Sequence, residues 1–174
     1  MRHVTRQGRC WRVADPEWPD PLSPDYARER GGRWNPPGAF GVIYLNASRP
    51  VARAQVLQRL EPRGIHPEDL DQTAGPVLVG AELPSGRYVD AVTDAGLRAL
   101  GLSTSYPLDT SGRTVPHSAC QPIGPRAREA NEPGVACRSA ARRAPPDSEE
   151  LAYFGGAKLC ALQVEAFAEW FWGE

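Results

Sequence analysis

Glycine and proline recur so often in this sequence that its regular elements should be short. The chain carries 17 glycines and 18 prolines in 174 residues, about one residue in five, where an average protein has roughly one in eight. Both residue types mark turns and end helices and strands. We therefore expect a loop-rich fold of short elements, and the length suits one domain.

Short apolar runs alternate with a few helical patterns between the turns. The segment 15–30 is expected to be an irregular loop, and Pro84, Ser85 and Gly86 a turn between two strands. Ser48 should cap a helix from Pro50 to Leu60, and Thr93 should begin a short helix that Gly101 ends. Part of 117–131 should be helical, and the polar stretch 102–115 should be a loop. Strands are expected at 9–14, 41–46, 76–83, 87–92, 134–139 and 151–154, with a further strand and helix in 158–172.

This pattern predicts an α+β (mixed α/β) fold in a single compact domain, residues 1–174, with its core at about 9–172. Net charge is −1, so no global field draws the chain to nucleic acid. No apolar run is long enough for a membrane span, and the N-terminus lacks the apolar part of a secretory signal. We expect a cytoplasmic protein with reduced thiols and no metal, because the four cysteines form no CxxC pair.

Several short motifs follow one another in a defined order along the chain. CWRV (10–13) contains Arg12, GGRWNPPG (31–38) forms a stiff turn around Arg33, and VIYL (42–45) contains Tyr44. A helix pattern follows, then SACQ (118–121) and CRSAAR (137–142). This ordered set resembles the RES-domain family, the toxin component of bacterial RES–Xre toxin–antitoxin pairs.

The resemblance implies a fold similar to that of the ADP-ribosyltransferase toxins and a reaction that consumes NAD+. The nicotinamide–ribose bond would be split by hydrolysis (NAD+ glycohydrolase), by phosphorolysis (NAD+ phosphorylase) or by ADP-ribosyl transfer to a protein. It also implies an Xre-type antitoxin as partner. Contact with nucleic acid would then occur only through that antitoxin. A homodimer is compatible with the resemblance. The positions that it assigns to catalysis or to NAD+ binding are Arg12, Arg33, Trp34, Asn35, Tyr44, Gln55, Gln121 and Ser139.

The residue types suit this chemistry. Arginine forks make paired, charge-assisted hydrogen bonds to a pyrophosphate. Tyr44 and Trp34 offer flat faces to a nicotinamide or a ribose. Breaking the glycosidic bond builds positive charge on the ribose, which a nearby carboxylate stabilises.

Two positions depart from the family pattern. The family glutamate on the helix after the tyrosine strand is replaced here by Gln55, in ARAQVL (52–57). Glutamine keeps the shape of the side chain but not its charge, so activity could be impaired, and Glu29 or Glu61 are candidates to substitute. Arg138 stands where proline is usual beside the motif serine. A non-catalytic NAD- or protein-binding module is the alternative that Gln55 raises.

Each candidate also has an ordinary structural explanation. Arg12 could pair with Asp15 or Glu17 at the surface, and Trp34 and Tyr44 could be core residues. Periodicity alone places Gln55 on the helix surface. The aromatic C-terminal stretch AFAEWFW could be core or a docking surface. The functional prediction requires the arginines, Tyr44, Gln55 and Ser139 to converge on one cleft.

Overall fold

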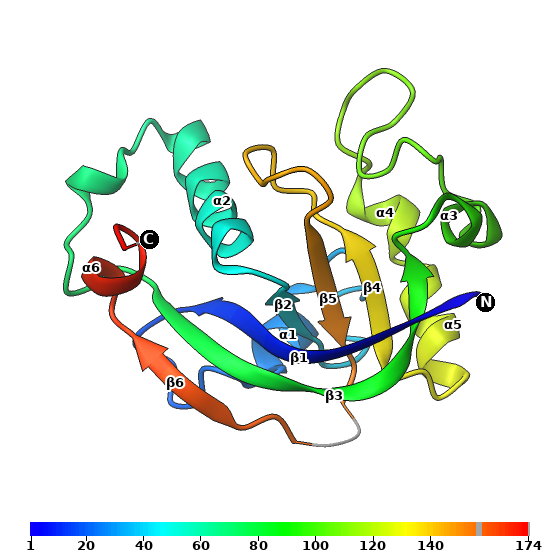
Figure 1. Ribbon diagram of the computed structural model, residues 1–174, viewed down its shortest axis with the longest axis horizontal. Helices are drawn as coiled ribbons and strands as arrows, with labels where there is room; N and C mark the ends of the chain where they lie inside the picture. Colours follow the sequence, from blue (N-terminus) through cyan, green and yellow to red (C-terminus); the bar gives the residue numbers. More distant parts are fainter. Residues whose placement is uncertain (156–157, 174) are drawn as a thin grey trace.

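The computed structural model describes residues 1–155 and 158–173, and within these residues it shows one mixed α/β domain (Figure 1). The strands are β1 (His3–Ala14), β2 (Ile43–Asn46), β3 (Val77–Ala91), β4 (Gly134–Arg138), β5 (Glu149–Tyr153) and β6 (Ala161–Glu165). The α-helices are α1 (Asp25–Arg30), α2 (Arg49–Leu60), α3 (Asp94–Leu100), α4 (His117–Cys120), α5 (Ile123–Glu129) and α6 (Phe167–Trp170), and two 3₁₀ turns span Glu61–Arg63 and Pro67–Asp69.

The strands form one sheet that curls back on itself. Its order is β1-β2-β5-β4-β3-β6, and β1 also pairs with β3, so five strands close into a small barrel-like ring. All pairings are antiparallel except β3 with β4. The strand pairing between β1 and β2 is a single residue pair, Trp11 opposite Asn46.

Apolar side chains fill three clusters around this sheet. One face of the curled sheet carries the first cluster, which includes Cys10, Leu45, Val79 and Leu151. The other face is covered in two places, as Figure 1 shows: α2 and α6 lie over one end, and α3, α4 and α5 over the other. Tyr44, Cys137 and Glu150, described below, have their side chains on that second face.

Two expectations about the strands are wrong. Residues 76–92 form one continuous strand, β3, without a turn at Pro84–Gly86, and β1 begins at His3 instead of near residue 9. The cause is long-range pairing, because β1 runs along β3 from His3 opposite Val89 to Ala14 opposite Val77. A register shift between Arg6 and Gly8 absorbs the irregularity at the proline, as β-bulges do.

The helices follow the local signals more closely. Thr93 caps α3 by accepting a 3.0 Å hydrogen bond from the Gly96 amide, and Gly101 ends it in the left-handed conformation. Ser48 occupies the N-cap position of α2, but its side chain makes no capping bond. The loop expected over 15–30 contains the short helix α1.

The aromatic C-terminal stretch is mostly core. Phe167, Trp170 and Phe171 are buried against α2 and β3, while Trp172 stays 42% exposed. Cys10, Cys120 and Cys137 are buried free thiols, and Cys160 is an exposed one. None of the helices in the described residues has the length and apolar character needed to cross a membrane.

Candidate functional site

The glycine- and proline-rich turn at 31–38 is held from within by Tyr44 and Asn35. The Tyr44 hydroxyl accepts a 2.9 Å hydrogen bond from the Trp34 amide and donates a 2.8 Å bond to the side-chain oxygen of Asn35. The Asn35 amide group donates in turn to the carbonyls of Ala27 and Phe40, at 2.6 and 3.1 Å. Asn35 is fully buried, so in this structure these two residues shape the backbone on either side of Arg33.

Two glycines and Gln121 lock the same turn. A Cβ atom on Gly32 would lie 2.5 Å from the Tyr44 ring, and one on Gly124 would lie 1.5 Å from the Trp34 carbonyl oxygen. Both positions therefore require glycine. The Gln121 side chain donates to the Gly32 carbonyl at 3.0 Å and more weakly to that of Asn35, so it ties α4 to the turn.

Arg33 leaves this turn and points toward the residues under α3 and α4. Its Nη1 donates a 2.8 Å hydrogen bond to the Val115 carbonyl, and its guanidinium also interacts with the Cys120 thiol. The pKa of His117 is lowered by burial and by the positive charge of Arg33. The charge of Arg33 is thus felt by side chains on α4.

Cys137 on β4 marks the place where several of these groups meet. Burial raises the pKa of its thiol, and the charge of nearby Glu150 raises that pKa further. Contacts with Trp34 and Tyr106 and the charge of Arg33 lower it. Burial likewise raises the pKa of Tyr44, which lies within reach of Cys137 and Arg33. These effects agree with the sheet register, which sets Glu150 directly opposite this buried thiol.

Ser139 follows β4 and is hydrogen-bonded to Glu150. Its hydroxyl donates a 2.6 Å bond to Oε1 of Glu150, which also accepts a 3.0 Å bond from the Ala140 amide. In the sheet, Glu150 is opposite both Asn46 and Cys137. Residues directly opposite or two apart on neighbouring strands share a face, so Glu150 lies on the same face as Tyr44.

Sequence analysis had missed Glu150 and Tyr106. Glu150 lies in a charged stretch with no periodic pattern, and only the sheet register assigns it a face. Tyr106 lies in the long loop after α3 and packs on Trp34, with ring centroids 6.2 Å apart. No local signal in the sequence distinguishes it.

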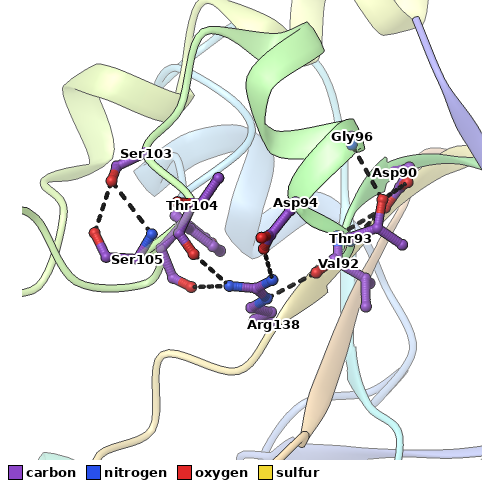
Figure 2. Close-up of polar contacts among 10 residues, drawn as sticks. Asp90, Val92, Thr93, Asp94, Gly96, Ser103, Thr104, Ser105 and Arg138 are labelled. Carbon is purple, nitrogen blue, oxygen red and sulfur yellow. Dashed lines mark hydrogen bonds and ion pairs between the residues drawn. The ribbon is translucent and has the colours of Figure 1, made fainter.

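Arg138, next to Cys137 on β4, holds the loop after α3 in place (Figure 2). Its guanidinium donates to the carbonyls of Val92, Thr104 and Tyr106 at 2.7, 2.6 and 3.2 Å, and it forms a 2.8 Å ion pair with Asp94. The arginine that replaces the usual proline therefore fastens the segment that carries Tyr106.

Gln55 lies on α2 and is half-buried, not fully exposed as periodicity predicted. Within the described part of the chain its side chain makes no hydrogen bond. One turn further along the same side of the helix, Gln58 accepts a 2.8 Å bond from the Arg142 amide. The side of α2 that carries Gln55 is therefore turned toward the segment that begins at Ser139, which lies beside α2 in Figure 1.

The structure does not bring Arg12 to this cluster. Because Trp11 is opposite Asn46, Arg12 faces the other side of the sheet from Tyr44. There it is 5% exposed, donates a 2.8 Å bond to the Ser23 carbonyl and lies 5.2 Å from the centre of the Trp18 ring. Burial lowers its pKa to about 10. A surface ion pair with Asp15 or Glu17 is also wrong.

The structure thus brings together Arg33, Trp34, Asn35, Tyr44 and Gln121, and it separates Arg12 from them. Ser139 is bonded to Glu150 on the face of the sheet that carries Tyr44, and Gln55 lies on the side of α2 that faces the segment after Ser139. Two surface hollows of about 350 Å³ each lie elsewhere: one beside Ile43 and Tyr153, the other beside Trp18 and Tyr26. Among the described residues, no group of three histidine, cysteine, aspartate or glutamate side chains could hold a metal ion.

Comparison with known proteins identifies the fold and the family of the chain. A chain of the crystal structure of the M. tuberculosis MbcT–MbcA toxin–antitoxin complex superposes with a TM-score of 0.77 at 23% sequence identity, over 97% of this chain and 91% of that one. The likeness confirms the expected single mixed α/β domain. A search of curated proteins found no match. The model of the RES domain matches residues 9–170, so the chain belongs to the RES domain family.

Proposed function

We propose that this chain is a toxin that binds NAD+ and cleaves its nicotinamide–ribose bond. The observation that carries the proposal is the cluster around Cys137, where a cationic fork, a tyrosine and a serine–carboxylate pair share one face of the sheet. A guanidinium group is suited to binding phosphate, and a carboxylate is suited to stabilising a positively charged ribose.

The reaction breaks the bond between C1′ of the ribose and N1 of the nicotinamide ring. The electron pair of that bond leaves with nicotinamide, which departs as a neutral molecule. The ribose carbon gains a bond to an oxygen of water, of inorganic phosphate or of a protein side chain, and the proton of a water or protein acceptor is released to solvent. The developing charge on the ribose is the feature that a protein can stabilise most strongly.

In this proposal Arg33 meets the pyrophosphate. One of its nitrogens already bonds the Val115 carbonyl, and a guanidinium has five donors in all, so others remain for oxygens of a ligand. Tyr44, Asn35 and Gln121 fix the turn from which Arg33 projects. Ser139 holds a carboxylate beside the reacting sugar. Arg12 supports the segment after β1 from the opposite face.

The toxin role also implies a protein that neutralises it. The chain of similar fold was solved in a toxin–antitoxin complex, which supports an antitoxin of the Xre type as the partner. Contact with DNA would then pass through that partner, and the pair would act in the cytoplasm, where NAD+ is available.

Nicotinamide release from NAD+ tests the proposal directly. The purified chain is incubated with NAD+, with and without inorganic phosphate, and nicotinamide and the ADP-ribose product are separated and quantified. Release that depends on phosphate identifies phosphorolysis, and release without it identifies hydrolysis. A chain that releases no nicotinamide under either condition would contradict the proposal.

Gln55 favours a second candidate, a member of the family that binds NAD+ without cleaving it. Here calorimetry would show NAD+ binding, no nicotinamide would form, and Arg33→Ala would abolish binding. Arg30→Ala is the matched control, because Arg30 is exposed at the end of α1, three residues before Arg33.

A further inference from the structure

We propose that Glu150 provides the negative charge that Gln55 lacks, and that its free carboxylate oxygen contacts the ribose of NAD+ during bond cleavage. This inference rests on the proposed function and assigns a catalytic residue to it. Neither the family resemblance nor the motif positions include Glu150.

The first argument is position. Glu150 is opposite Asn46 on one side and Cys137 on the other, so its side chain is on the face where Tyr44 and Arg33 meet. Its charge is felt by two members of that group, because it raises the pKa of both Cys137 and Tyr106 in addition to the effect of burial. The carboxylate therefore belongs to the same local environment as the arginine proposed to bind the pyrophosphate.

The second argument is how the carboxylate is held. Both hydrogen bonds that it accepts, from the Ser139 hydroxyl and the Ala140 amide, go to Oε1. Within the described residues Oε2 has no partner. An ionised carboxylate held by one oxygen presents the other in a fixed direction, which is the preorganisation that stabilises a developing positive charge.

The third argument is that the other candidate carboxylates are engaged or turned elsewhere. Glu61 forms a 2.9 Å ion pair with Arg143 and is exposed. Glu29 on α1 borders the hollow beside Trp18 and Tyr26. Glu149, adjacent to Glu150, faces the opposite side of the sheet and forms a two-fold ion pair with Arg6 at 2.7 Å. Among the residues that the structure describes, Glu150 accepts hydrogen bonds only from uncharged donors.

Gln55 and Glu150 would then share the role of the family glutamate, which is to bond and stabilise the ribose. The segment from Ser139 to Ser148 joins Glu150 to the side of α2 that carries Gln55 and Gln58. The amide of Gln55 can bond a ribose hydroxyl without charge, while Glu150 supplies the charge from β5. The family glutamate would combine both properties in one side chain.

The test compares Glu150→Gln with Glu149→Gln. Both remove one charge from adjacent residues of β5, but only the first lies on the face of Arg33. Nicotinamide release is measured over a range of NAD+ concentrations, and NAD+ affinity by calorimetry. Glu150→Gln is expected to lower kcat by about 10²–10³-fold with little change in affinity, whereas Glu149→Gln should stay within about twofold of the unaltered chain.

A double variant separates charge from folding. Adding Gln55→Glu to Glu150→Gln returns a carboxylate from α2, and recovery of at least about tenfold in kcat would show that the lost charge, and not a disturbed fold, caused the defect. Circular dichroism and thermal unfolding of each variant check folding directly.

The two hypotheses fail in different ways. Glu150→Gln with an unchanged kcat, beside an active unaltered chain, overturns the role of Glu150 and leaves NAD+ cleavage standing. A defect in Glu150→Gln that the added Gln55→Glu does not relieve also overturns it. An unaltered chain that releases no nicotinamide overturns both.

Discussion

The hydroxyl of Ser139 donates a 2.6 Å hydrogen bond to Oε1 of Glu150 and so joins the segment after β4 to the start of β5. The same hydroxyl oxygen accepts a 3.1 Å bond from the Ala141 amide. The motif serine is thus a connector between a backbone turn and a carboxylate, and its oxygen is committed to both. We infer that it acts by holding Glu150, not by attacking the substrate.

Replacing Ser139 by alanine tests that role. The loss of one hydrogen bond to a charged group costs about 1.5–3 kcal/mol, so nicotinamide release should fall by about tenfold or more, and Ser139→Thr should retain most of it. Ser148→Ala, at the other end of the same segment, is the control. A total loss of activity equal to that of a deleted nucleophile, with Ser139→Thr equally inactive, would contradict a connecting role.

Tyr44→Phe should destabilise the chain. It leaves the Trp34 amide and the Asn35 side-chain oxygen each without the partner that they have now, at a cost of about 1–3 kcal/mol. Urea unfolding followed by tryptophan fluorescence would measure it. Tyr26→Phe, at an exposed position on α1, should change the free energy of unfolding by far less; equal effects would show that the Tyr44 hydroxyl does not hold the turn.

Gln55→Glu should make nicotinamide release faster. It restores the carboxylate of the family pattern on the side of α2 turned toward Ser139, and one preorganised charge is worth up to about 10²–10³ in rate. Gln58→Glu, three residues along, is the control, because that side chain is engaged with the Arg142 amide. Equal and absent activity in the Gln55→Glu variant and the unaltered chain would count against catalysis through this position.

The titration of His117 should report the charge of Arg33. Its pKa is below the ordinary value of 6.5 because of burial and that charge, so proton NMR should show a midpoint under 6.5 that rises in Arg33→Gln. A lowered folded-state pKa means that the unfolded chain binds the proton first. Stability from this group is therefore complete above about pH 6.5 and declines as the pH falls through the folded-state value. An unshifted midpoint in both chains would contradict the proximity of the two side chains.

Elements with local signals could be predicted from the sequence, and elements that depend on distant pairing could not. Thr93 and Gly101 bounded α3 because capping is a property of a few adjacent residues. The union of 76–83 with 87–92 in β3 could not be predicted, because only the partner strand β1, more than sixty residues away in sequence, makes that stretch continuous.

The same distinction divides the candidate site. Arg33 and Tyr44 are eleven residues apart, and the turn between them brings them together by short-range geometry. The face on which the Arg12 side chain lies depends on the register between β1 and β2. A shift of one residue in that register would have turned it to the opposite face. Glu150 could not be predicted from the sequence, because only the strand register shows which glutamate of this charged stretch faces the site.

The turn around Arg33 has a consequence for how a ligand would be received. Its main chain is already held by hydrogen bonds from Tyr44, Asn35 and Gln121. It is also packed closely where Gly32 meets Tyr44 and Gly124 meets Trp34. An incoming anion would therefore order only the arginine side chain, and the entropic penalty of association at this point would be confined to a few rotatable bonds. Affinity gained here would come from rigidity built during folding, and mutations that loosen the turn would weaken binding even where they touch no atom of the ligand.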